Sequence, residues 1–77
     1  MEISMHTEGL MCGKCEAKAE SAILALEGVN DVEADHVENV ISIDIDEDAI
    51  DPEDFVALAE DAIVDCGYKV VSTEILD

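Results

Sequence analysis

The chain has 77 residues, enough for one small domain spanning residues 1–77, and 49% of them are apolar, which suffices for a thin hydrophobic core. It carries 21 acidic residues against three lysines, so its formal net charge is −18. This balance excludes nucleic acid as a partner, because phosphate binding requires clustered basic side chains, and it argues against docking on an anionic membrane.

The first part of the chain predicts a strand followed by a helix. Apolar and polar side chains alternate over residues 3–8, as in a half-buried strand, and Gly9 ends this pattern. Apolar residues then recur at helical spacing over residues 12–26, and Gly28 provides a helix stop. The apolar positions of this helix are Cys15, Ala19, Ala22, Ile23 and Leu26.

The middle of the chain predicts a hairpin. Residues 29–34 form one candidate strand, and residues 40–45 alternate cleanly as another. The polar residues 35–39 between them form a turn short enough to join two adjacent antiparallel strands.

The last part predicts a second helix and a final strand. Asp51 is a suitable N-cap, Pro52 suits the first helical position, and acidic residues in the first turn are favoured by the helix dipole. Gly67 ends this helix, and residues 68–76 form the last strand. The apolar stripe of the helix comprises Phe55, Leu58, Ala59, Ala62, Ile63 and Cys66.

The predicted order is strand–helix–strand–strand–helix–strand. Its simplest solution is an α+β fold of the ferredoxin-like βαββαβ type, in which a four-stranded antiparallel sheet carries both helices on one face. In this arrangement the end of the first strand, the start of the first helix, the hairpin turn and the end of the second helix meet at one edge. We therefore expect these side chains at one end of the molecule: Cys12, Cys15, His36, Cys66 and Tyr68.

Cys12 and Cys15 form a C-x-x-C motif at the junction of the first strand and the first helix. Two thiols at this spacing can converge on one metal ion, and a helix N-terminus stabilises thiolate charge. Thiolates favour soft ions such as Cu(I), Zn(II) and Hg(II) over hard cations. The same motif also marks thiol redox proteins, whereas a structural zinc site usually needs a second such pair, which this sequence lacks.

Three segments together resemble the heavy-metal-associated domain family. They are G-L-M-C-G-K-C at residues 9–15, L-E-G-V at residues 26–29 and D-C-G-Y-K-V at residues 65–70. This family includes soluble copper chaperones, the N-terminal modules of metal-transporting P-type ATPases and the periplasmic mercury-binding protein. The resemblance covers nearly the whole chain and implies the ferredoxin-like fold that the order of elements also indicates.

The resemblance implies that Cys12 and Cys15 carry the metal, which in this family is usually Cu(I) between two thiolates. Leu10 stands where the family usually has Met, and we expect it to serve as the buried prop beneath the loop. Met11 stands where relatives usually have Thr or Ser, or Asp when they prefer zinc or cadmium. Its soft thioether favours Cu(I).

Cys66 departs most from the family pattern, at a position commonly filled by Ala, Thr or Gln. As a third thiolate it would favour three-coordinate Cu(I), or leave Zn(II) one ligand short of its usual four. Alternatively, it is a small buried residue on the stripe of the second helix, as cysteine often is. Its expected place at the metal end keeps both interpretations open.

Other polar residues are expected near the metal end. Tyr68 resembles the aromatic residue that many relatives place beside the site, although a partly buried tyrosine at a strand start is an equal alternative. His36 is expected at this end without binding the metal, and His6 on the open, solvent-facing side of the sheet. All three lysines fall at the metal end, where ammonium groups lower thiol pKa values; they are Lys14, Lys18 and Lys69.

The acidic residues are spread along the whole chain. A dense carboxylate surface is typical of a halophilic acidic protein, because salt screens its self-repulsion. An acidic docking face for a basic partner is the alternative, and the even spread favours the halophilic interpretation. The acidic run over residues 44–51 lacks the glycine and the closing glutamate of a calcium loop, so we interpret it as solvated surface.

The sequence predicts a metallochaperone and not an enzyme. It would bind one Cu(I) through Cys12 and Cys15 and pass the ion by thiolate exchange to a metal-transporting P-type ATPase or a similar acceptor. A Zn(II) or Hg(II) carrier or sensor that uses Cys66 as third ligand is one alternative. A small dithiol oxidoreductase of the thioredoxin kind is another, although such folds need a cis-proline opposite the dithiol and Pro52 is expected at the far end.

The sequence also bears on the cellular location and the oligomeric state of the protein. No apolar run approaches the roughly 18 residues of a membrane-spanning helix, and the first residues lack the features of a signal peptide. We therefore expect a cytoplasmic protein without membrane insertion. A monomer and a metal-bridged dimer both fit the sequence, as do a free-standing chaperone and a module of a larger transporter.

Overall fold

The computed structural model, which describes residues 1–76, contains a sheet whose two central strands bury every second side chain. In β1 (Glu2–Glu8), Ile3 and Met5 are fully buried and their neighbours are exposed or half-buried. β3 (Val40–Ile45) shows the same alternation. This pattern is typical of an antiparallel sheet with one face on the core.

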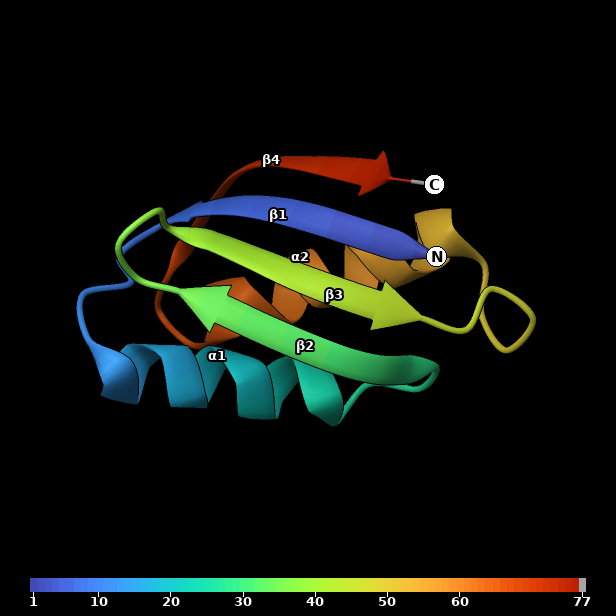
Figure 1. Ribbon diagram of the computed structural model, residues 1–77, viewed down its shortest axis with the longest axis horizontal. Helices are drawn as coiled ribbons and strands as arrows, with labels where there is room; N and C mark the ends of the chain where they lie inside the picture. Colours follow the sequence, from blue (N-terminus) through green and yellow to red (C-terminus); the bar gives the residue numbers. More distant parts are fainter. Residues whose placement is uncertain (77) are drawn as a thin grey trace.

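Four strands form this sheet in the order β2-β3-β1-β4, and every neighbouring pair is antiparallel (Figure 1). β2 (Val29–Asp35) and β4 (Lys69–Leu76) are the edge strands. β1 and β3 lie in the middle, where Ile3 pairs with Ile43. The order confirms the predicted ferredoxin-like α+β fold.

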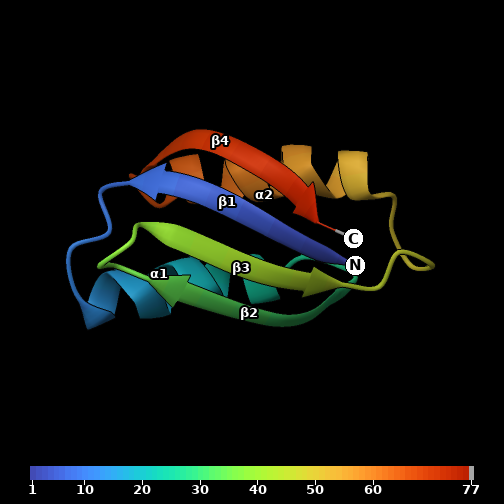
Figure 2. The ribbon, with the colours of Figure 1, turned by 45° about the horizontal axis from the view of Figure 1, so that its top comes forward.

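Helices α1 (Gly13–Leu24) and α2 (Pro52–Asp65) lie on the same side of the sheet, as Figure 2 shows. α1 packs mainly against β2, and α2 against β4. Neither helix of the described part of the chain is long and apolar enough to cross a membrane. The core between sheet and helices consists of Ile3, Met5, Leu10, Ala19, Ile23, Val32, Ala34, Ile41, Ile43, Ile45, Phe55, Ala59 and Ile63.

The helix ends show where the sequence signals hold. α2 begins as predicted, because the Asp51 carboxylate accepts a hydrogen bond of 3.0 Å from the Glu53 N–H and Pro52 takes the first helical position. α1 ends at Leu24, two residues earlier than predicted. The Leu26 N–H bonds to the Ile23 carbonyl at 3.0 Å, which tightens the turn after the helix.

Gly28 explains why the chain turns away at this point. Its φ is +88°, and a Cβ there would lie 2.5 Å from the Ile50 Cγ2 atom. The glycine therefore redirects the chain into β2 rather than capping α1. The strand bounds differ from the prediction by one residue at three places, since β1 begins one residue earlier, β2 ends one residue later and β4 begins one residue later.

Two side chains are placed differently from the prediction. Leu58 is 46% exposed, because it lies on the flank of α2 while Phe55 and Ala59 face the core. His6 is half-buried rather than exposed to solvent. Its strand is central in the sheet, so Val40 and Ser72 flank it on either side.

One end of the molecule gathers five chain segments, on the left in Figure 1. β1 ends there beside the start of β4, with Glu8 paired with Lys69. α1 begins there, α2 ends there, and the β2–β3 turn lies there as well. We call this the thiol end and define it by residues 9–16, 35–39 and 66–69; its existence confirms the prediction from topology.

Candidate metal centre

The loop between β1 and α1 is shaped by one glycine and one buried leucine. Gly9 has a φ of +109°, and a Cβ on it would lie 3.2 Å from Cδ1 of Tyr68. The Leu10 side chain is buried in the core at 3% exposure, which confirms its predicted role as the prop of the loop. After this anchor the chain turns outward, and Met11 and Cys12 are exposed.

The two thiols of the C-x-x-C motif converge. The Cys12 and Cys15 Sγ atoms are 3.9 Å apart, and both cysteines are free. With metal–sulfur bonds of about 2.3 Å, two sulfurs at this separation can bind one ion with a bent angle, and a linear arrangement needs about 4.6 Å. Because Cys12 is exposed at the end of the loop, its side chain can open outward to reach either geometry.

Cys15 is activated by its neighbours. The hydrogen bond from the Tyr68 hydroxyl is the largest cause that lowers the pKa of Cys15 from 9.0 to about 7, followed by the Met11 N–H. A contribution from Cys12 adds to these, and desolvation opposes them. The same hydrogen bond raises the pKa of Tyr68 to about 12, so its hydroxyl remains a donor at neutral pH. A substantial fraction of Cys15 is therefore thiolate near pH 7.

Tyr68→Phe tests this activation directly. Because the variant keeps the ring against Gly9 and removes only the hydroxyl, we expect the pKa of Cys15 to rise from about 7 toward 9.0. Alkylation of Cys15 by iodoacetamide is followed from pH 5 to pH 10 in two chains with Cys12 and Cys66 replaced by alanine, one with Tyr68 and one with Tyr68→Phe. Because Cys12 also lowers the pKa of Cys15, the difference between these two chains measures the effect of the hydroxyl. An unchanged pH profile would show that Tyr68 does not activate the thiol.

Cys66 lies at the C-cap of α2, half-buried and close to the same tyrosine. Lys18 Nζ donates a hydrogen bond of 3.0 Å to the Cys66 carbonyl and lies 5.9 Å from the centroid of the Tyr68 ring. The charges of Cys66 and Cys12 both contribute to the raised pKa of Tyr68. Within residues 1–76 no three His, Cys, Asp or Glu side chains are grouped to hold one ion, so ligation by Cys66 stays a prediction.

Lys14 and Lys69 lie within the thiol end, and Lys18, just beyond it on α1, reaches into it with its side chain. Lys14 is in the first turn of α1, beside Cys15. Lys18 reaches across to the end of α2, and Lys69 begins β4. In a chain of net charge −18, the three basic side chains therefore gather around this end, although Glu16, Asp35 and Glu38 lie there as well.

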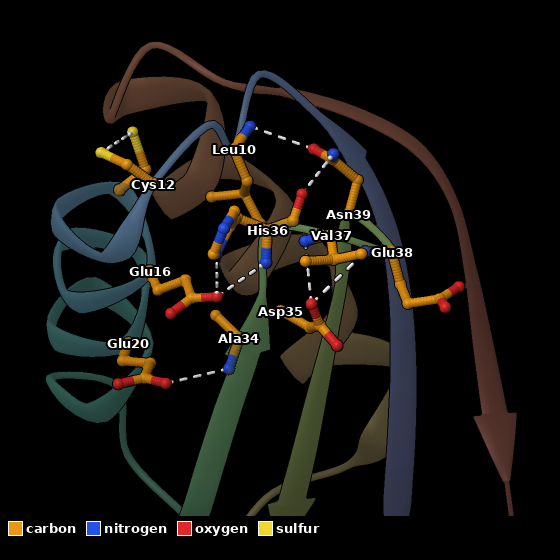
Figure 3. A network of polar contacts seen from close by, with 11 residues as sticks. Leu10, Cys12, Glu16, Glu20, Ala34, Asp35, His36, Val37, Glu38 and Asn39 are labelled. Atoms are coloured by element: carbon orange, nitrogen blue, oxygen red, sulfur yellow. Dashed lines mark hydrogen bonds and ion pairs between the residues drawn. The ribbon is translucent and has the colours of Figure 1, made fainter.

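Figure 3 shows a hydrogen-bonded network behind the loop that the sequence did not predict. The carboxylate oxygen Oε2 of Glu16 lies 2.6 Å from Nδ1 of His36 and accepts the His36 N–H at 2.7 Å. These contacts lower the pKa of Glu16, with the backbone hydrogen bond as the largest cause. His36 lies at the thiol end as expected, and its ring is bound by a carboxylate.

Asn39 connects this network to the loop between β1 and α1. Its Oδ1 accepts the Leu10 N–H at 3.0 Å, and its Nδ2 donates to the His36 carbonyl at 3.1 Å. The turn residues 35–39 carried a sequence signal, since asparagine tolerates the left-handed conformation that Asn39 adopts at φ +53°. Its contact with Leu10 spans 29 positions, which local sequence does not indicate.

Comparison with known proteins agrees with this geometry. Residues 5–69 match the family model described as "Heavy-metal-associated domain". "Copper chaperone CopZ" of Staphylococcus haemolyticus (strain JCSC1435) is 35% identical over 66 residues, which cover 86% of this chain and 91% of that protein.

Solved structures show the same similarity in three dimensions. The structure of "CopZ metallochaperone" superposes with a TM-score of 0.82 and 30% identity, and the match covers 92% of this chain and 100% of that one. The solution structure of the N-terminal domain of ZntA in its Zn(II)-form superposes with a TM-score of 0.77 and 28% identity, covering 91% of this chain and 88% of that one.

Proposed function

Because the chain belongs to the heavy-metal-associated domain family, we propose that it is a metallochaperone that binds one Cu(I) through Cys12 and Cys15. The observation that carries this proposal is the pair of Sγ atoms 3.9 Å apart at the start of α1, where Cys12 is exposed and Cys15 is half-buried. The lowered pKa of Cys15 supports it, since thiolates and not thiols bind metal. The copper chaperones among its relatives support the choice of ion.

Transfer would proceed by thiolate exchange with an acceptor that carries a similar pair of cysteines, such as the N-terminal domain of a metal-transporting P-type ATPase. In each step one copper–sulfur bond to the acceptor forms and one bond to this chain breaks, and copper stays Cu(I) throughout. The exposed Cys12 is the sulfur that an acceptor can approach first. Because the thiols must stay reduced to bind metal, we place the protein in the reducing cytoplasm.

The metal choice rests on the donor set. Two thiolates with the thioether of Met11, 81% exposed next to them, are soft ligands that suit Cu(I). A Zn(II) or Hg(II) carrier or sensor is the second candidate, in which Cys66 would supply a third sulfur. The relative with a structure in its Zn(II)-form favours keeping this candidate.

An anaerobic Cu(I) titration against a chromophoric chelator tests the proposal. We expect the reduced chain to bind one Cu(I), and we expect Cys66→Ala to change the affinity by less than about threefold if Cys66 only packs against its neighbours. A loss of tenfold or more, about 1.4 kcal/mol, would show that Cys66 is a ligand. Failure of the unmodified chain to compete for Cu(I) would contradict the proposal in favour of Zn(II) or Hg(II).

A disulfide reductase assay separates the carrier from the dithiol oxidoreductase. Pro52 opens α2 at the end opposite the thiols, so it does not face Cys12 and Cys15. We therefore expect no catalytic turnover of insulin or glutathione disulfide by the reduced chain. Sustained turnover that depends on both cysteines would replace the carrier assignment by an enzymatic one.

A further inference from the structure

The loop between β1 and α1, residues 9–12, carries Cys12, and we call it the metal loop. It is supported on two sides by parts of the chain that are distant in sequence. On one side the Tyr68 ring packs against Gly9, where a Cβ would come within 3.2 Å of it. On the other side the β2–β3 turn contacts the loop through Asn39. Leu10 is buried, and the next residues, Met11 and Cys12, are exposed.

Asn39 uses both its side chain and its backbone to hold this region. Its Oδ1 accepts the N–H of Leu10, two residues before Cys12, at 3.0 Å. Its carbonyl oxygen accepts both the N–H of Thr7 at 2.8 Å and the hydroxyl of Thr7 at 3.2 Å. Asn39 is therefore hydrogen-bonded both to the end of β1, through Thr7, and to the start of the loop, through Leu10.

The same turn also holds the far side of the C-x-x-C motif. Glu16, the residue after Cys15, accepts the N–H of His36 at 2.7 Å. Nδ2 of Asn39 donates to the carbonyl of His36 at 3.1 Å. Hydrogen bonds within the turn also fix its shape, because the Asp35 carboxylate accepts the N–H groups of Val37 at 2.8 Å and Glu38 at 3.3 Å.

We propose that the β2–β3 turn is the template that holds the metal loop in its binding conformation, with Asn39 as the positioning residue. This inference rests on the proposed function and adds a residue outside the C-x-x-C motif to it. The left-handed conformation of Asn39 at φ +53° is what lets one residue present its carbonyl to Thr7 and its amide to Leu10 at once. Without the amide, the loop loses its hydrogen bond two residues before the first thiol.

Asn39→Gly is the test variant, because glycine adopts the same backbone conformation and removes only the side chain. From the worth of one hydrogen bond we expect the Cu(I) affinity to fall about three- to tenfold. Asn39→Asp keeps an acceptor for the Leu10 N–H and loses only the donor to the His36 carbonyl, so its affinity should fall less than that of Asn39→Gly. Both are measured by chelator competition in about 0.5 M NaCl, which screens the added charge.

Ile45→Val is the matched control. Ile45 is a core residue at the other end of the sheet, so its truncation lowers stability without touching the loop. Amide hydrogen exchange gives a second readout. In Asn39→Gly the Leu10 N–H should exchange faster than in the unmodified chain. In Ile45→Val its exchange rate should change no more than the rates of the neighbouring amides. Urea unfolding of each variant gives the accompanying change in stability.

Three results would overturn the inference: unchanged affinity in Asn39→Gly, an equal loss in Ile45→Val, or a loss in Asn39→Asp as large as in Asn39→Gly. If the unmodified chain binds no Cu(I), the proposed function fails instead. The exchange rate of the Leu10 N–H then decides by itself whether Asn39 orders the loop.

Discussion

Cys15→Ser is expected to lower the Cu(I) affinity of the chain at least about 100-fold, or about 2.7 kcal/mol. A serine hydroxyl is a hard ligand that stays protonated at neutral pH, so it does not replace a thiolate on a soft ion. The substitution removes the cysteine whose pKa is lowered from 9.0 to about 7, which gives up its proton to a metal more readily than an ordinary thiol. Anaerobic chelator competition at pH 7 measures the effect, and Cys12→Ser should show a comparable loss.

Ala17→Ser provides the matched control for this substitution. It places the same hydroxyl on an exposed position of α1, two residues from Cys15, and should leave the affinity unchanged. Urea unfolding of both variants checks that the fold is retained, since Cys15 is only half-buried. Retention of tight Cu(I) binding by Cys15→Ser would remove the C-x-x-C pair as the metal site.

The Cu(I) affinity is also expected to depend on pH. Because the folded pKa of Cys15 is lowered to about 7, protons compete with the metal for this sulfur only below that value. The apparent Cu(I) affinity should therefore fall as the pH is lowered from 7 to 5 and change less above 8.

The placement of the cysteines was predictable because topology alone determines it. A strand that ends at Glu8 and a helix that ends at Asp65 must meet at one edge once the order of elements is known. The alternation around Ile3 and the capping residues Asp51 and Pro52 are local signals strong enough to set that order.

The contacts that complete the candidate site were not predictable in the same way. No motif in the sequence singles out Glu16, because its bond to His36 joins residues 20 positions apart. The partial burial of His6 and the exposure of Leu58 likewise depend on which elements flank each position. Local patterns indicate which face a residue occupies, but neighbouring elements decide how far that face is covered.

The charge of the protein leads to the second large effect, because almost nothing in the structure offsets it. The two ion pairs within residues 1–76 involve the amino terminus with Asp44 and His36 with Glu16, so the lysines there form none. α2 carries Asp65 in its last turn, where the helix dipole disfavours negative charge; that turn has no basic residue of its own, and Lys18 of α1 is the cation that reaches its C-cap. Repulsion among 21 acidic residues is therefore opposed mainly by the apolar core.

We expect the melting temperature to rise by about 10–20 °C between 0.05 and 2 M NaCl, because screening removes a repulsion of a few kcal/mol. Each kcal/mol shifts the midpoint of a domain this size by about 4–8 °C.

Asp65→Asn should raise the melting temperature in dilute buffer and have little effect in concentrated salt. Asp54→Asn, which removes the same charge from the first turn of α2, should stabilise less, since the dipole favours an acid there. Calorimetry or circular dichroism at both salt concentrations separates the two variants. A melting temperature that does not depend on salt would mean that the carboxylates are too far apart and too well hydrated to repel, and the halophilic interpretation would lose its physical basis.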